Sequence, residues 1–164
     1  AKRYDLYACY LSSDVKFKYR VIIPVYQNYE LVTYVGRDVT NSSPTKYQNC
    51  PIEKSVLPIK DCLYNIDTVR DKAIIVEGVT DVWRLGDGAV ATFGTQFTKA
   101  QIAKLAGLDK VFVLFDSDAK EEAEKLATEV SGVVRQVETV LLEQGDPADL
   151  SQEQALKLKK NLME

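Results

Sequence analysis

The sequence predicts an α/β protein in which a mainly parallel sheet lies between helices, preceded by a small α+β lobe. In the second half of the chain, strand-length apolar runs alternate with helical patterns, an order typical of parallel sheets with right-handed crossovers. The first half holds β-rich runs joined by a hairpin signal, without this alternation. We therefore expect a basic lobe over residues 1–70 and an α/β domain over residues 71–164.

Periodicity and capping residues define the elements of the second half. Apolar runs at 73–76, 89–93 and 110–115 predict strands, and residues 133–142 hold another. The run at 110–115 is continuous in Val, Phe and Leu, so we expect it to lie centrally with both faces covered. Helical patterns cover residues 79–85 and 119–130. Thr98 and Ser151 each stand three residues before a glutamine, which predicts a capping box at the start of two further helices.

A hairpin dominates the first half. Residues 20–26 and 30–36 are rich in β-branched and aromatic side chains, and Gln27-Asn28-Tyr29 between them suits a turn. Asn41-Ser42-Ser43-Pro44 predicts the loop that follows.

Composition excludes several classes of protein. Of the 164 residues 46% are hydrophobic, enough for a buried core. No apolar run approaches the roughly 20 residues of a membrane span, and no signal peptide opens the chain, so we expect a cytoplasmic protein that does not contact membranes. Three cysteines without histidine or a C-x-x-C pair cannot build a zinc site.

The two halves differ in charge. Residues 1–72 carry 11 basic and 8 acidic side chains, whereas residues 73–164 carry 10 and 16. Such asymmetry suits an anionic ligand held by the basic half and a metal held by carboxylates of the acidic half. Chance is the alternative explanation.

Carboxylates follow two of the predicted strands. Glu77 ends the first strand of the acidic half, Asp116 and Asp118 end the central one, and Asp81 lies one turn into the helix after Glu77. We expect them to converge, because ligands bind at the carboxyl ends of strands in open parallel sheets. Repulsion among them favours a divalent cation, and oxygen ligands alone indicate Mg²⁺, or Mn²⁺ as a substitute. The alternative is that these are ordinary helix-capping and loop carboxylates.

Three motifs resemble the TOPRIM domain shared by DnaG-type primases, topoisomerases and several nucleases. They are Glu77-Gly78-Val79-Thr80-Asp81, Phe93-Gly94-Thr95 and Phe115-Asp116-Ser117-Asp118-Ala119. The preceding lobe resembles that of bacterial and phage DnaG-type primase cores in Arg20-Val21-Ile22-Ile23-Pro24-Val25, Tyr34-Val35-Gly36-Arg37, Lys46-Tyr47-Gln48-Asn49-Cys50-Pro51 and Leu63-Tyr64-Asn65. The resemblance covers residues 18–150.

This resemblance implies a nucleotidyltransferase that synthesises short RNA primers on single-stranded DNA during replication, with Mg²⁺ and without zinc in this chain. It implies that Glu77 is a general base or a metal-orienting carboxylate and that Asp116 and Asp118 bind metal with support from Asp81. Asp146 and Asp149 resemble a further acidic pair of metal ligands, although Asp149 stands one position late. For that pair the alternative is a turn before the helix at Ser151.

The resemblance also assigns basic and polar residues to the polyanions. Lys18 and Arg20 correspond to residues suited to the template backbone, whereas Arg37, Lys46 and Asn49 correspond to positions near nucleotide phosphates. Lys60 matches less closely, because it stands three rather than four residues before Leu63. The implied partners are single-stranded DNA, ribonucleoside triphosphates and a replicative helicase or other replisome protein, the last through regions outside this chain. Solvated surface charge is the alternative for each basic residue.

Two other classes of function stay open. One is a TOPRIM nuclease or strand-passing fragment, and the other is a non-catalytic single-stranded nucleic-acid-binding module that retains the fold. The DnaG-like first lobe argues against a nuclease, and the lack of a tyrosine nucleophile domain argues against a topoisomerase. Retention of Glu77, Asp116 and Asp118 favours chemistry, because a pure binding module would gain only repulsion from them.

Overall fold

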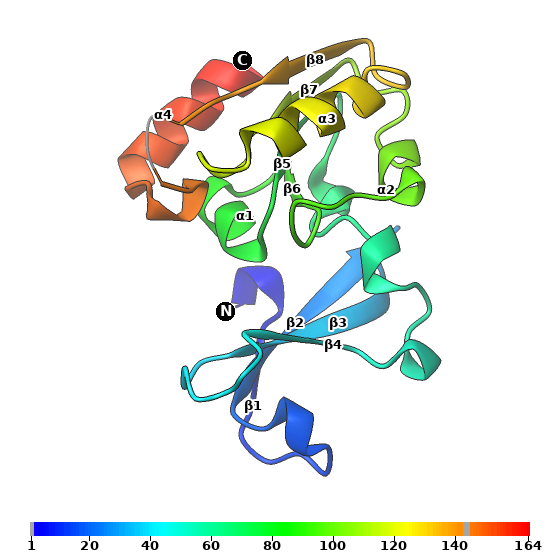
Figure 1. The fold of residues 1–164 in the computed structure, drawn as a ribbon, viewed down its shortest axis with the longest axis vertical. Coiled ribbons are helices and arrows are strands. Elements are labelled where there is room, and N and C mark those ends of the chain that lie inside the picture. Colours follow the sequence, from blue (N-terminus) through cyan, green and yellow to red (C-terminus); the bar gives the residue numbers. More distant parts are fainter. Residues whose placement is uncertain (1, 143–144) are drawn as a thin grey trace. The chain divides into compact units, whose positions relative to one another are not determined.

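The computed structural model describes residues 2–142 and 145–164, and the chain divides into two compact units between Ile59 and Lys60 (Figure 1). Residues 60–70, which the sequence analysis placed with the first lobe, fold with the second unit. Leu63 and Tyr64 are buried there, and Tyr64 exchanges backbone hydrogen bonds of 2.9 and 3.2 Å with Ala91. Apolar burial therefore attaches this connecting segment to the α/β unit.

The first unit is built on a four-stranded antiparallel sheet of order β1-β2-β3-β4. The predicted hairpin is confirmed, and its turn residues Asn28 and Tyr29 both have positive φ angles, 55° and 63°, as in the two-residue turns that match strand twist. Its strands are β1 (Tyr7–Cys9), β2 (Arg20–Gln27), β3 (Glu30–Asp38) and β4 (Tyr47–Asn49). Its helical turns are η1 (Lys2–Tyr4), η2 (Val15–Phe17) and η3 (Ile52–Lys54), and η4 (Ile59–Asp61) spans the division.

The second unit has a four-stranded, wholly parallel sheet of order β6-β5-β7-β8, which confirms the predicted α/β class. Its strands are β5 (Lys72–Val76), β6 (Ala89–Ala91), β7 (Lys110–Val113) and β8 (Gln136–Thr139). Its helices are α1 (Val79–Leu85), α2 (Lys99–Ala103), α3 (Lys120–Val130) and α4 (Gln152–Met163), with 3-10 turns η5 (Ile66–Thr68) and η6 (Pro147–Asp149). Among the described residues, none of the helices combines the length and apolar character needed to cross a bilayer.

The strands β5 and β7 lie at the centre of this sheet, as the continuous apolar run at 110–115 predicts. Ile75, Val111 and Val113 are fully buried in a core closed by Ile102 of α2 and Leu126 of α3. The strand predicted within residues 133–142 is β8, an edge strand whose four residues pair with the four residues of β7.

Both predicted capping boxes are present. The Thr98 hydroxyl accepts a hydrogen bond from the Gln101 amide at 3.2 Å, and the Gln101 side chain accepts one from the Thr98 amide at 2.9 Å. Ser151 and Gln154 repeat this reciprocal pair at the start of α4. These local signals fix where α2 and α4 begin.

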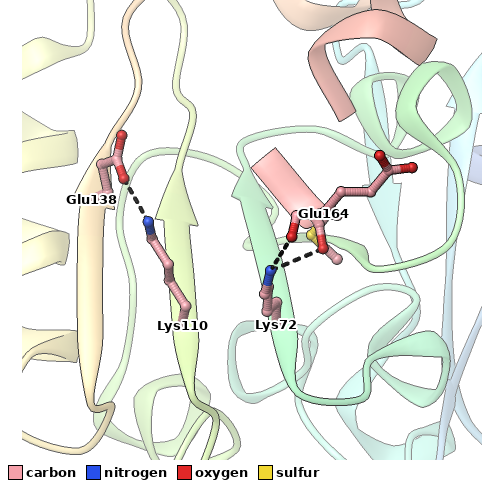
Figure 2. Close-up of polar contacts among 5 residues, drawn as sticks. Lys72, Lys110, Glu138 and Glu164 are labelled. Carbon is pink, nitrogen blue, oxygen red and sulfur yellow. Dashed lines mark hydrogen bonds and ion pairs between the residues drawn. The ribbon is translucent and has the colours of Figure 1, made fainter. Parts of the chain in front are cut away.

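The first residues of the central strands are two lysines, Lys72 and Lys110, which pair across β5 and β7. Figure 2 shows that Lys72 Nζ donates to the carbonyl oxygens of Met163 and Glu164, at 2.9 and 3.4 Å. Lys110 Nζ pairs with Glu138 Oε2 at 2.8 Å. Lys72 thus places a positive charge at the negative end of the α4 dipole, while the acidic residues considered below follow the opposite ends of the strands.

Candidate functional site

Glu77 connects the ends of the two central strands. It follows β5 directly, is half-buried, and its Oε1 accepts a hydrogen bond of 3.0 Å from the backbone amide of Asp116, which follows β7. Burial raises the pKa of Glu77, and the negative charges of Asp116, Asp118 and Glu122 raise it further, against the effect of the Asp116 hydrogen bond. The structure therefore brings the predicted acidic residues Glu77, Asp116 and Asp118 within electrostatic reach of one another.

Asp81 lies on the first turn of α1, close enough to Glu77 and Asp116 for their charges to act on it. Its side chain is only 4% exposed, and its Oδ2 accepts a hydrogen bond of 2.9 Å from the Gly78 amide. Burial, followed by the charges of Asp116, Asp146 and Glu77, raises the pKa of Asp81 to about 7, although the Gly78 hydrogen bond opposes the rise. A Cβ atom at Gly78 would lie 3.2 Å from Asp81 Oδ2, so glycine allows this side chain to fold back on the turn.

Asp116 and Asp118 lie in the tight turn between β7 and α3. The Ala119 amide donates a 2.9 Å hydrogen bond to the Asp116 carbonyl, which closes the turn. Asp116 is half-buried, whereas Asp118 is exposed to solvent. The turn thus bonds Glu77 through the backbone of Asp116 and leaves the carboxylate of Asp118 open to ligands from solvent.

The acidic pair near the C-terminus divides into two different environments. Asp146 caps η6 by accepting a 3.0 Å hydrogen bond from the Asp149 amide, and its charge contributes to the raised pKa of Asp81. Asp149 is exposed, and its carboxylate lies over Gly145, where a Cβ atom would come within 2.9 Å of Oδ2. Arg84 of α1 donates to the Ala148 carbonyl at 3.2 Å and holds η6 beside α1. Asp146 therefore joins the acidic group. The Gly145 carbonyl accepts a 3.3 Å hydrogen bond from the Ser117 amide, between Asp116 and Asp118, so Asp149 lies over a residue that contacts their turn.

The donor set suits a hard divalent cation in charge and chemistry, because every side chain in the group supplies carboxylate oxygens and the neighbouring carboxylates raise the pKa of both Glu77 and Asp81. Over residues 2–142 and 145–164, however, no three acidic or cysteine side chains are gathered closely enough to hold one ion. The predicted metal ligands thus lie near one another, but their carboxylates do not converge on one point, so their role as a set of metal ligands stays a prediction.

Two predicted polyanion contacts on β2 and the turn before it have opposite environments. Lys18 is exposed and lines a cavity of about 370 Å³ in the first unit, together with Lys16 and Tyr19. Arg20 lines the same cavity but is only 4% exposed. Its guanidinium donates to backbone and hydroxyl oxygens of the lobe itself. Arg20 is thus a buried residue whose guanidinium binds the lobe itself, and the sequence pattern did not indicate this.

Arg37 and Lys46 meet at Tyr47. Arg37 pairs with Tyr47 across β3 and β4, and the two cations lie 5.6 and 6.0 Å from the tyrosine ring centroid, within the range of cation–π attraction. Arg37 Nη1 is buried and has no hydrogen-bond acceptor among the residues that the structure describes. Asn49 is exposed at the end of β4. The contacts at Tyr47 could not be predicted from the sequence, because β4, the strand that pairs Tyr47 with Arg37, is not among the strands that the sequence predicts.

Lys60 belongs to the second unit. Its Nζ donates a hydrogen bond of 3.1 Å to the carbonyl of Phe93, next to Gly94 of the Phe93-Gly94-Thr95 motif. Lys60 is exposed, so its ammonium group remains open to a further anionic contact beside this loop.

Comparisons with known proteins agree with this fold. No family model matches the chain. The chain is 31% identical over 150 residues to a DNA primase of Deinococcus radiodurans, covering 82% of this chain and 26% of the relative. It is 32% identical over 121 residues to a DNA primase of Clostridium acetobutylicum, covering 68% of this chain and 20% of the relative. The chain thus spans about a quarter or less of the length of these relatives.

Two solved structures share the fold. The zinc-binding and RNA polymerase domains of the Aquifex aeolicus primase match with a TM-score of 0.76 at 24% identity, covering 97% of this chain and 43% of that one. The primase fragment of the bacteriophage T7 primase-helicase matches with a TM-score of 0.57 at 17% identity, covering 88% and 65%. Sequence relatives and fold together place this chain with the cores of bacterial, DnaG-type DNA primases.

Proposed function

We propose that this chain is a primase catalytic core, which synthesises short RNA primers on single-stranded DNA by Mg²⁺-dependent nucleotidyl transfer. The observation that carries the proposal is the Glu77–Asp116 hydrogen bond of 3.0 Å, which holds two acidic strand ends together. The primase relatives supply the reaction class. A cytoplasmic role in replication belongs to the same proposal. So does a helicase or other replisome partner, because one structural neighbour is the primase fragment of a primase-helicase.

In the proposed reaction, the 3′-hydroxyl of the growing primer attacks the α-phosphorus of a ribonucleoside triphosphate, and pyrophosphate leaves. Glu77 is suited to accept or orient the proton of that hydroxyl, because its raised pKa makes it a stronger base than an ordinary glutamate. Asp116, Asp118 and Asp146 would hold the cation, with Glu77 as a further ligand, and a bound Mg²⁺ supplies charge neutralisation of the phosphates. Asp149 would be a further ligand, and Asp81 would support the group.

The basic residues of the first unit would bind the substrates. Lys18 at the rim of its cavity suits the phosphodiester backbone of the template. Arg37 and Lys46, which share the Tyr47 ring, suit the phosphates of the incoming nucleotide, with Asn49 beside them. Lys60 would add an anionic contact next to the Phe93–Gly94 loop.

The test is primer synthesis on single-stranded DNA with labelled ribonucleotides and Mg²⁺ or Mn²⁺. Wild type is compared with Glu77→Gln, which keeps an oxygen acceptor for the Asp116 amide but removes the base. The matched control is Glu121→Gln, an exposed carboxylate of α3. Short RNA products that disappear only in Glu77→Gln would support the proposal. Cleavage of the DNA would instead indicate a nuclease, and binding without products would indicate a non-catalytic module.

A further inference from the structure

We propose that Arg20 is a positioning residue that anchors the loop between β3 and β4 and thereby places Lys46, instead of contacting the template itself. The inference concerns the first unit alone. It rests on the proposed function in one respect, since it takes Lys46 to contact nucleotide phosphates.

The hydrogen bonds of Arg20 lead to three separate parts of the lobe. Nε donates to the Lys16 carbonyl at 2.7 Å, and Nη1 donates to the Gly36 and Lys46 carbonyls, both at 3.2 Å. Nη2 donates to Ser43 Oγ at 2.7 Å, and to the carbonyl and hydroxyl of Thr45 at 3.0 and 3.3 Å. The five N–H donors of a guanidinium thus face six acceptors, so the group has no donor left over for a phosphate.

Residues packed against the Arg20 side chain also hold it in the position from which it makes these hydrogen bonds. Gly36 lies under its side chain, where a Cβ atom would come within 3.0 Å of Arg20 Cδ and 2.9 Å of Phe17 Cδ1. The Asp38 carboxylate, opposite Arg20 in the β2–β3 register, binds the Thr40 hydroxyl at 2.8 Å. A buried cation is tolerated only when its charge and donors are met, and here the loop supplies four of the six acceptors, from Ser43, Thr45 and Lys46.

The loop ends at Lys46, whose carbonyl accepts from both Arg20 Nη1, at 3.2 Å, and the Asp38 amide, at 2.9 Å. The next residue is Tyr47, on whose ring Arg37 and Lys46 converge. Loss of the hydrogen bonds of Arg20 would release the backbone of Lys46, and its ammonium group would no longer be held in place. Arg20 therefore acts on nucleotide binding through Lys46.

The experiment uses Arg20→Lys, which keeps the positive charge but cannot reproduce a planar fork with five donors. Hydrogen exchange of the amides in residues 41–46, the dissociation constant for ATP with Mg²⁺, and the salt dependence of single-stranded DNA binding are measured. We expect loop amides to exchange about 10-fold faster and ATP to bind about as weakly as in Lys46→Ala. The Arg20→Lys/Lys46→Ala double variant should bind ATP no more weakly than Lys46→Ala, because the two residues act on one contact.

Two controls separate anchoring from direct contact. Ser43→Ala removes one acceptor without changing Arg20 and should speed loop exchange by a smaller factor, which keeps the test valid if Arg20→Lys folds poorly. Lys18→Ala should lower the salt slope of DNA binding by about one, whereas Arg20→Gln, which removes the positive charge of Arg20, should leave the slope unchanged.

Wild-type loop exchange in both Arg20→Lys and Ser43→Ala would overturn the proposal, as would a double variant whose loss of ATP affinity equals the product of the two single losses. Failure of the proposed function gives a different result. If Lys46→Ala binds ATP as wild type does, the nucleotide role of Lys46 is rejected and the functional part of this inference falls with it, while the exchange rates still decide whether Arg20 anchors the loop.

Discussion

The side chain of Glu77 accepts a 3.0 Å hydrogen bond from the main chain of Asp116, 39 residues later in the sequence. The bond spans the two central strands at their carboxyl ends, where a parallel sheet presents side chains to ligands. The hydrogen bond fixes the orientation of the Glu77 carboxylate, and it places this group beside the negative charges that help to raise its pKa.

Replacement of Asp118 by Asn should abolish most primer synthesis without destabilising the fold. Asp118 is exposed, so the free energy of unfolding should change by no more than about 0.5 kcal/mol. Loss of a charge at the proposed cation site should lower the synthesis rate by about 100-fold or more. Asp109→Asn is the control, because Asp109 is exposed, precedes the same strand, β7, and forms a 3.6 Å ion pair with the exposed Arg135. Equal activity in the two variants would count against the assignment of Asp118.

Replacement of Asp81 by Asn should stabilise the metal-free protein more at pH 8 than at pH 4. The pKa of Asp81 rises from 3.8 to about 7 on folding, so between these values the folded state binds a proton that the unfolded state has released. The relative advantage of the folded state is therefore present at low pH and is lost as the pH rises through about 7.

Asn is neutral at all these pH values and can still accept the Gly78 hydrogen bond. We expect a gain of about 1–3 kcal/mol at pH 8 and little change at pH 4, measured by urea unfolding in a chelating buffer. A shift of the same size at both pH values would mean that Asp81 is ionised throughout.

Replacement of Lys72 by Met should loosen the end of α4. It removes the hydrogen bonds of 2.9 and 3.4 Å to the last carbonyls of that helix (Figure 2) and a charge that complements its dipole, at a cost of about 1 kcal/mol. Lys110→Met, which breaks the partly exposed pair with Glu138, is the matched control and should cost less. Hydrogen exchange in residues 158–163 should accelerate only in Lys72→Met, and uniform exchange in both variants would contradict this role.

Replacement of Gly36 by Ala should destabilise the first unit by about 1–3 kcal/mol. The added methyl group would lie 2.9 Å from Phe17 Cδ1, a buried ring atom, and 3.0 Å from Arg20 Cδ. Gly132→Ala is the comparison, since its nearest contact is 3.4 Å from the Glu129 carbonyl, and it should remain within about 0.5 kcal/mol of wild type. Thermal unfolding of both variants measures the difference, and equal melting temperatures would show that the sheet yields at Gly36.

Local sequence signals predicted much of the fold. The capping boxes at Thr98 and Ser151 use atoms only three residues apart, so they act in any tertiary context. The central position of β7 follows from its unbroken apolar run, because only a strand covered on both faces tolerates one. The end of β8 could not be predicted from local signals, since it depends on the number of residues that β7 offers for pairing.

The sequence by itself determined the parallel α/β class, the hairpin of the first unit and the placing of acidic residues after the central strands, because hydrophobic period and turn chemistry are local properties. Tertiary structure alone decided how those charged residues differ. Asp81 became buried with a pKa of about 7 while Asp118 stayed in solvent, and Arg20 became a buried donor while Lys18 stayed exposed. The physical reason is that solvation and hydrogen-bond partners come from segments far apart in the chain, and no local pattern encodes which of them meet.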